Sequence, residues 1–305
     1  MPQKPIKHRI KIFAVCCAYT AVLLGCEVYT GKENTDVDQS SAESVVLRLI
    51  NNAGLTSAMG RVLYIANWYT SISLAKYLYI KYKWLVNGTI TPTDKKTRSG
   101  DDIPLLKLSN GALLKVKRGW MREAVLKVKP SNCIDGSRRE YQIQCTTWKD
   151  KKQVMFLHTN EVGPTKPGSK VKRWVKGKPK RVEFDGPRSQ RDYSQYFNAI
   201  DRNDQDSSNN TISVKTNRWY LRIFFWKLDR VVHLYFIVVT YLASQNLGPS
   251  EWKNYKSKHG GRQIFQIHLG LSLITYGICQ DWDDFTDFTK KTFMDASSTS
   301  SAMRL

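Results

Sequence analysis

The six cysteines of this 305-residue chain include no Cys-x-x-Cys pair. A structural zinc site usually shows paired ligands at short spacing, so the sequence predicts no zinc site. A disulfide framework is also not expected, because such frameworks belong to short chains that are rich in cysteine. The simplest interpretation of these thiols is that they are reduced and mostly structural, in an intracellular protein.

Acidic residues are scarce: 26 Asp and Glu face 48 Lys and Arg, which gives a formal net charge of +22 and a pI of about 9.7. This imbalance indicates a polyanionic partner, either nucleic acid or an anionic membrane surface. A basic soluble protein without such a partner, such as a ribosomal protein, is the alternative. Hydrophobic content of 41% and nine Trp residues favour a folded chain over a disordered one.

Apolar runs long enough to span a membrane are also missing. Residues 12–26 form a fifteen-residue apolar run behind a basic segment, a pattern that resembles a secretory signal. Two short buried strands joined by a turn near residues 18–21 explain the run equally well, because buried strands read as continuous apolar stretches. From these residues alone, both interpretations stay open.

Periodicity predicts the elements that follow. Residues 40–59 carry Val45, Val46, Leu49 and Ile50 at helical spacing, which predicts an amphipathic helix. We expect strands at 61–65 and 84–90, a helix over 71–81, a β-rich region with loops from about 91 to 181, one or two helices within 217–245 and another over 264–278.

A basic run at residues 166–181 contains no acid. Its eight charged residues are Lys166, Lys170, Lys172, Arg173, Lys176, Lys178, Lys180 and Arg181. Side chains of this kind neutralise phosphates and release counterions, and Trp174 within the run favours a contact surface. We therefore predict a DNA-contacting arm, with a solvated, flexible loop as the alternative.

Five stretches, taken in order, resemble the piggyBac family of transposases. They are KPIKHRIKIFAVCCAYTAVLLGCEVYTGK at 4–32, VLYIANWYTSISLA at 62–75, NGTITP at 87–92, TWKDKKQVMFLHT at 147–159, and RDYSQYFNAIDRNDQD at 191–206 followed by TNRWYLRIFFWKLD at 216–229. The resemblance covers roughly residues 4–245, and the order and spacing are more specific than any single motif.

The resemblance implies an α/β fold with an RNase H-like core, interrupted by a β-rich insertion and followed by helices that dimerise and bind DNA. The implied divisions are 1–92 for the first part of the core, 93–187 for the basic insertion, 188–210 for the return to the core, 211–290 for the helical region and 291–305 for a disordered tail. The resemblance also favours strands over a secretory signal in residues 12–26, and it implies a nuclear protein without a membrane segment. It implies double-stranded DNA as the partner. The family's zinc module has no counterpart in this sequence. Homodimer formation is left open.

Transposases of this DDE type hold two divalent cations with three carboxylates, because Mg²⁺ prefers oxygen ligands. The family's first Asp lies upstream of the Lys-Pro segment, so we expect it to be absent here. Its second Asp aligns with Ala66, whose methyl group cannot ligate a metal. The third matches Asp201, with Asp204 one helical turn further on. Asn67 and Asp204 are the auxiliary ligands that could substitute for the lost carboxylates.

With its partners lost, we interpret the acidic stretch DRNDQDSSNN, which begins at Asp201, as a polar, solvated turn. Beside the lost acid we expect structural roles, with Trp68 in the core and Thr70 or Ser71 capping the next helix. The sequence thus predicts a catalytically inactive, transposase-derived DNA-binding protein with no cofactor, Mg²⁺ belonging to the ancestral activity. A decayed fragment without function and a weakly active enzyme with substitute ligands are the alternatives.

Overall fold

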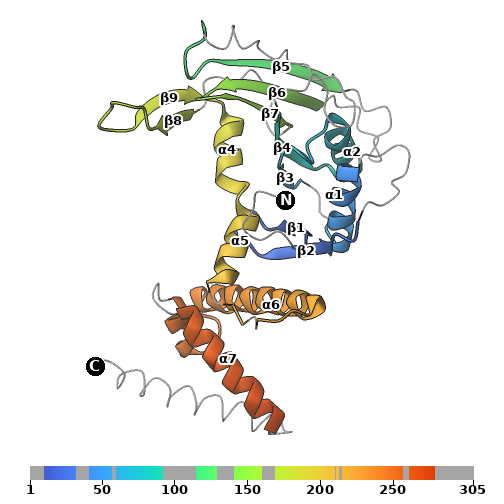
Figure 1. Ribbon diagram of the computed structural model, residues 1–305, viewed down its shortest axis with the longest axis vertical. Helices are drawn as coiled ribbons and strands as arrows, with labels where there is room; N and C mark the ends of the chain where they lie inside the picture. The colour runs from blue at the N-terminus through green and yellow to red at the C-terminus, as the bar shows by residue number, and fades with distance from the viewer. Residues whose placement is uncertain are drawn as a thin grey trace. The chain divides into compact units, whose positions relative to one another are not determined.

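The computed structural model describes residues 10–31, 41–56, 60–91, 115–128, 141–159, 169–209, 211–212, 215–256 and 261–278. The chain has a mixed α/β fold and divides into two compact units, Met1–Asp201 and Arg202–Leu305 (Figure 1). Of the predicted segments, Lys166 and the tail at 291–305 lie outside the described residues. No helix in the described part of the chain is both long enough and apolar enough to cross a membrane.

The first unit begins with a two-stranded antiparallel hairpin, β1 (Ile12–Cys16) and β2 (Leu23–Val28). The strand interpretation of residues 12–26 is therefore confirmed. Helix α1 (Ser41–Asn52) packs on this hairpin, and Val45 and Leu49 meet Phe13 in a small apolar cluster that includes Trp68 at its margin. The amphipathic helix predicted over residues 40–59 is confirmed, although it ends earlier.

A five-stranded mixed sheet forms the centre of this unit, in the order β3-β4-β7-β6-β5. Its strands are β3 (Val62–Ile65), β4 (Leu85–Ile90), β5 (Met121–Val128), β6 (Tyr141–Lys149) and β7 (Gln153–His158). Strands β3 and β4 run parallel, as a strand–helix–strand crossover requires, and the remaining pairs are antiparallel.

Helix α2 (Ile72–Tyr82) makes the crossover between β3 and β4. Ser71 caps it, because its Oγ accepts a hydrogen bond from the Leu74 backbone N–H at 3.0 Å, which confirms one of the two capping residues predicted. The helix buries Leu74, Ala75 and Leu78 against the sheet core.

Three strands of the range predicted to form the insertion domain extend the same sheet. Strand β7 pairs directly with β4, and β6 and β5 follow outward from it. A separate hairpin, β8 (Ser169–Arg173) and β9 (Val182–Gly186), comes after them. The described part of residues 93–187 is therefore continuous with the core sheet up to β7, and the exact domain limits stay a prediction.

Helices α4 (Arg188–Tyr196) and α5 (Ala199–Ser208) follow the hairpin. The Asn87 amide on β4 donates to the Ser189 carbonyl at 3.0 Å, and this bond attaches the start of α4 to the sheet. The interpretation of residues 201–210 as a solvated turn is wrong for 201–208, which are helical. Asn203 and Ser207, four residues apart, are buried on one helix face, so packing overrides the weak helix propensity of Asn, Asp and Ser.

The second unit contains α6 (Trp219–Ser244), the short 3₁₀ helix η1 (Ser250–Lys256) and α7 (Gly261–Ile278). The helices predicted within 217–245 and over 264–278 are thus confirmed, the first as one 26-residue helix. Its core is small and consists of Val232, Val239, Tyr255 and Phe265.

Candidate functional site

The described part of the basic run forms the β8–β9 hairpin and the turn between its strands. On the strands, two lysines face acids across the ladder: Lys170 Nζ lies 2.6 Å from Asp185 Oδ1, and Lys172 Nζ lies 3.5 Å from Glu183 Oε1. Cross-strand pairs of opposite charge stabilise a hairpin modestly. These two lysines are therefore partly neutralised within the hairpin itself.

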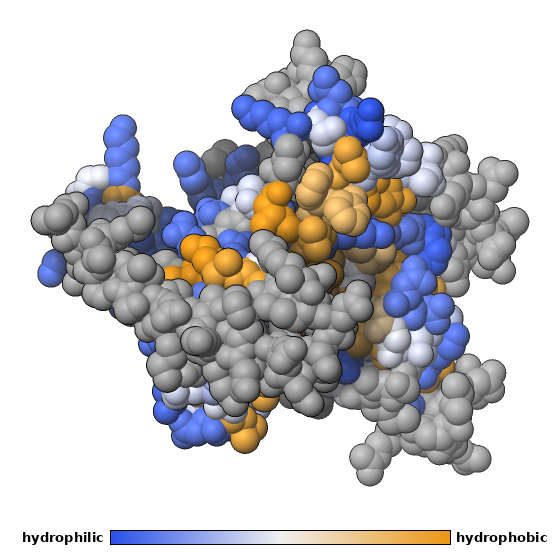
Figure 2. Space-filling model, turned by 90° about the horizontal axis from the view of Figure 1, so that it is seen from below, coloured by the Kyte–Doolittle hydropathy of each residue, from blue (hydrophilic) through white to orange (hydrophobic). Residues whose placement is uncertain are grey.

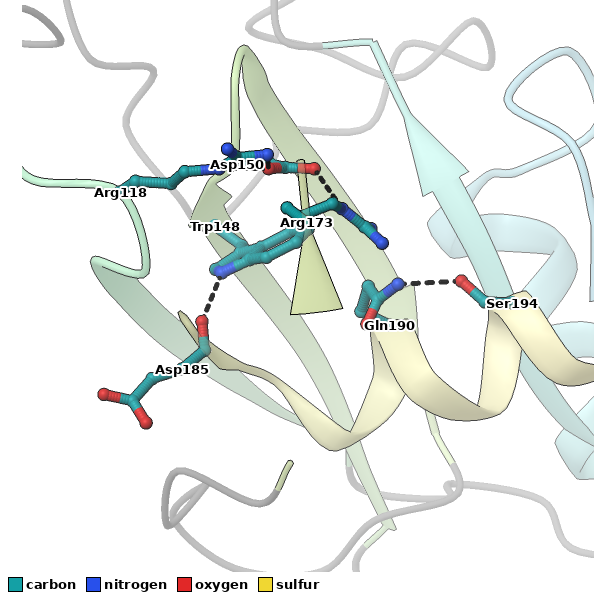
Figure 3. Close-up of polar contacts among 7 residues, drawn as sticks. All are labelled: Arg118, Trp148, Asp150, Arg173, Asp185, Gln190 and Ser194. Atoms are coloured by element: carbon teal, nitrogen blue, oxygen red, sulfur yellow. Dashed lines mark hydrogen bonds and ion pairs between the residues drawn. The ribbon is translucent and has the colours of Figure 1, made fainter. Parts of the chain in front are cut away.

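A single carboxylate anchors the base of the hairpin (Figure 3). Asp150, in the turn between β6 and β7, accepts from Arg118 Nε at 2.6 Å on Oδ1 and from Arg173 Nε at 3.0 Å on Oδ2. Partial burial raises the pKa of Asp150, but the hydrogen bonds and charges of the two arginines outweigh it, so the pKa is lower than usual. Arg173 therefore holds the hairpin to the sheet.

Trp148 provides a second attachment on the other strand. This indole is buried, and its Nε1–H donates to the Asp185 backbone carbonyl of β9 at 2.8 Å (Figure 3). The Arg173 guanidinium also lies 5.9 Å from the centre of the Trp148 ring. Each hairpin strand is thus attached to the sheet. Within α4, which follows the hairpin, Gln190 Nε2 donates to Ser194 Oγ one turn further along the same helix, at 2.8 Å.

The turn that joins β8 to β9 concentrates positive charge. Lys176, Lys178, Lys180 and Arg181 are all exposed there. Trp174 is 64% exposed, and the Arg181 guanidinium lies 5.6 Å from its ring centre. We define these four basic residues with Trp174 as the hairpin tip. The structure therefore separates the predicted DNA-contacting residues into a tip with exposed charges and a base whose charges are paired.

Ala66, the position that the resemblance assigns to the second acid, follows β3 directly and is exposed. It lines a cavity of about 490 Å³ in the first unit. Tyr196 and Ile200 line the same cavity, so the structure brings the end of β3 to the residue that precedes Asp201. Tyr64 also lines this cavity, and its ring centre lies 5.1 Å from that of Tyr196. Burial is the main cause that raises the pKa of Tyr64 to about 12, followed by the nearby Asp192 and Tyr196.

Asp201 and Asp204, the two acids expected to remain, have different surroundings. Asp201 is exposed in the first turn of α5, and the Asp204 carboxylate binds the guanidinium of Arg230, which is only 7% exposed. Asn67 donates its amide to Thr91 Oγ1 at 2.6 Å. Among the described residues, no group of three or more His, Cys, Asp or Glu side chains could hold a metal ion. A methyl group at Ala66 and an arginine-bound Asp204 do not fit the two-cation arrangement of a DDE enzyme.

The second unit contains a basic cavity that the sequence did not indicate. It is open, about 1040 Å³ in volume, and lined by Lys215, Arg222 and Arg230 together with Asp204 and Asp229. Its acids are engaged, since Asp229 accepts from Thr211 Oγ1 at 2.7 Å and from the Ile212 N–H at 2.8 Å. These residues are dispersed between positions 204 and 230, so no local motif could have revealed the cavity.

No curated protein matches this sequence. Among solved structures, a piggyBac transposase synaptic complex with hairpin DNA matches with a TM-score of 0.62 and 21% sequence identity over 95% of this chain. The match covers 52% of that transposase, so this chain spans about half its length. A family model described as Transposase IS4 matches residues 1–233. The chain therefore belongs to the Transposase IS4 family.

Proposed function

We propose that this chain is a piggyBac-type, transposase-derived protein that binds double-stranded DNA through the hairpin tip and does not catalyse strand transfer. The observation that carries the proposal is the tip: four exposed basic side chains and an exposed Trp at the end of a hairpin attached at its base. Phosphate contacts of Lys and Arg provide most of the affinity of sequence-independent DNA binding. A fixed base reduces the ordering that binding would otherwise require.

The similarity to a transposase solved with hairpin DNA supports this proposal, as does the family membership. In the RNase H-like arrangement that we propose, β3 and the start of α5 carry the positions of the second and third acids. The cavity shared by Ala66 and Ile200 supports that arrangement.

The binding test uses the full chain, a fluorescent 30-base-pair duplex and a salt titration, about 50 to 300 mM, read by anisotropy. We expect affinity to fall steeply with salt, and the combined change of Lys176, Lys178, Lys180 and Arg181 to Ala to reduce the slope of log K against log salt. Each lost phosphate contact should lower that slope by about 0.9. Lys170→Ala with Lys172→Ala is the control, because these residues already face acids.

An unchanged slope in the tip variant would overturn the tip as the DNA contact. Absence of DNA binding at low salt would favour the alternative hypothesis, that the chain is a decayed fragment without function. For localisation, we propose the nucleus, and a fluorescent fusion that stays outside it would contradict this.

Loss of catalysis is tested with supercoiled plasmid in Mg²⁺ and in Mn²⁺. We expect no nicking by the wild-type chain, because Ala66 offers no ligand and Asp204 is bound to Arg230. Metal-dependent nicking that disappears on Asp201→Ala would establish the alternative, an enzyme with substitute ligands, and end this part of the proposal.

A further inference from the structure

The outer side of the β8–β9 hairpin carries three pairs of opposed residues. Two of them pair a lysine with an acid: Lys170 with Asp185, and Lys172 with Glu183. The ladder ends at Arg173 and Val182, so Trp174 and Arg181 stand opposite each other directly beyond it. In this third pair the cation faces an aromatic ring instead of an acid. The pairing that neutralises charge along the strands therefore stops where the hairpin tip begins.

The indole ring of Trp174 is held in place although it is 64% exposed. The Arg181 guanidinium lies 5.6 Å from the ring centre, which is a cation–π contact. The preceding residue, Arg173, is fixed by its hydrogen bond to Asp150 and lies 5.9 Å from the centre of the Trp148 ring (Figure 3). Trp174 therefore loses little conformational entropy when a ligand packs on its ring.

The turn beside Trp174 has a defined backbone. The Lys178 N–H donates to the Val175 carbonyl at 3.1 Å, which closes a four-residue turn. Gly177 has a φ of +79°, a conformation that glycine adopts without strain. The exposed cations of the tip all lie in or directly after this turn: Lys176, Lys178, Lys180 and Arg181. The hairpin tip thus presents one aromatic ring among four cations on an ordered support.

One exposed ring among cations matches the two parts of a nucleotide. Phosphates bind the cations, and the flat face of a base stacks on the ring. In an intact duplex each base face is covered by its neighbours, so the Trp174 ring has no stacking partner there unless the duplex is unstacked at a cost in free energy. An unpaired base at a bulge or a gap offers its face directly. An anionic membrane surface fits less well, because membrane binding grows with the apolar area inserted and the tip has a single indole ring.

We propose that the hairpin tip recognises an unpaired base in DNA, with the Trp174 ring stacked on the base and the tip cations bound to the flanking phosphates. This inference rests on the proposed DNA binding by the tip, and it names the kind of DNA that the tip prefers. Stacking of one base on an aromatic side chain changes affinity by about tenfold. The chain should therefore bind bulged or gapped DNA more tightly than an intact duplex.

Three fluorescent DNAs, each about 30 base pairs long, separate base stacking from charge and shape. The first is an intact duplex, the second has one unpaired adenosine in its middle, and the third has an abasic residue at the same place. The second and third DNAs carry the same phosphates and differ only in the base. With the full chain, the adenosine bulge should bind about tenfold more tightly than either of the other two, as measured by anisotropy.

Two variants within the tip distinguish the ring from the charge. Trp174→Ala should remove the preference for the adenosine bulge and change binding of the intact duplex by less than about twofold, and Trp174→Phe should keep part of the preference. Lys176→Ala should weaken binding of all three DNAs and keep the preference, because it removes a phosphate contact. Both side chains are exposed, so these substitutions should not prevent folding. With 2-aminopurine as the unpaired base, stacking should lower its fluorescence in complexes of the wild type and of Lys176→Ala, but not of Trp174→Ala.

Equal binding of the adenosine and abasic bulges by the wild type would overturn this inference, and because that comparison needs no variant, a misfolded variant would not prevent the decision. Retained binding of the intact duplex in that case would leave the proposed function standing, whereas absence of binding to all three DNAs would overturn both. A preference that survives Trp174→Ala would also overturn the inference. Equal binding of the two bulges, together with Trp174-dependent binding to vesicles of phosphatidylserine and phosphatidylcholine, would assign the ring to a membrane surface instead.

Discussion

Asp150 shows how one residue can hold an element that lies far from it in sequence. Its two carboxylate oxygens are shared between Arg118, which precedes β5, and Arg173, at the end of β8. Side-chain exposures of 18% for Asp150 and 22% for Arg118 place this pair at the margin of the interior, where charged hydrogen bonds count for more than at the open surface.

We expect Asp150→Asn to lower the free energy of unfolding by about 1 to 3 kcal/mol, because two guanidinium groups lose their charged acceptor. Urea denaturation measures the loss. The control is Asp192→Asn, whose partner Arg188 is largely exposed at 3.9 Å, and whose effect should stay below about 0.5 kcal/mol. Equal effects of the two substitutions would show that Asp150 has no special anchoring role.

His158 at the end of β7 is fully buried and hydrogen-bonds through Nε2 with Thr146 Oγ1 at 3.0 Å. Burial lowers the pKa of His158 to about 4. The folded protein therefore keeps this imidazole neutral at a pH where the unfolded chain, with a pKa near 6.5, would bind a proton. Stability is fully present above that unfolded value and decreases as the pH falls toward the folded value.

Between pH 6.5 and about 4, His158 should cost about 1.4 kcal/mol of stability for each unit of acidification. The prediction is a steeper loss for the wild type than for His158→Gln when urea midpoints are compared at pH 7 and pH 5. Parallel losses in the two proteins would mean that other groups cause the acid sensitivity.

At the scale of elements, α6 carries exposed, mostly apolar side chains along one line of its surface. Seven positions along it alternate in steps of three and four, the spacing of a coiled-coil seam, and all are exposed. They are Tyr220, Phe224, Lys227, Val231, Leu234, Val238 and Tyr241. Figure 2 shows hydrophobic residues, in orange, among hydrophilic residues, in blue, on the face that it draws. We propose that this seam is where the homodimer left open by the sequence would form.

Val231→Glu combined with Val238→Glu should convert a dimer into a monomer, because two charges would enter the seam. Light scattering after gel filtration measures the mass. Val125→Glu serves as control, since Val125 is similarly exposed but lies on β5, outside the seam. A wild-type chain that is monomeric at micromolar concentration would contradict the proposal.

At the scale of the whole molecule, the charge of +22 and the methyl group of Ala66 have different consequences. The charge favours a polyanionic partner over the entire surface, whereas a methyl group offers no oxygen ligand to a divalent cation. A ligand that binds only the folded state raises its thermal stability, so metal binding can be detected without any enzymatic assay.

We therefore expect about 5 mM Mg²⁺ or Mn²⁺ to leave the thermal midpoint unchanged relative to NaCl of equal ionic strength. Differential scanning calorimetry gives the comparison. An increase of several degrees that disappears on Asp201→Ala would reveal a metal site and contradict the expectation.

Local patterns in the sequence were sufficient for several features of this protein. The apolar spacing of α1, the apolar run that became β1 and β2, and Ser71 ahead of α2 each depend on neighbours within a few residues. The family resemblance also came from sequence, since ordered motifs survive where single residues have changed.

Other features were decided by tertiary structure. Residues 201–208 read as a turn because Asp, Asn and Ser favour turns, yet burial of Asn203 and Ser207 makes them helical. The sequence predicted that Lys170 and Lys172 contact DNA, whereas the hairpin places Asp185 and Glu183 opposite them. Which basic residues stay exposed depends on contacts between distant segments, and these contacts exist only once the chain has folded.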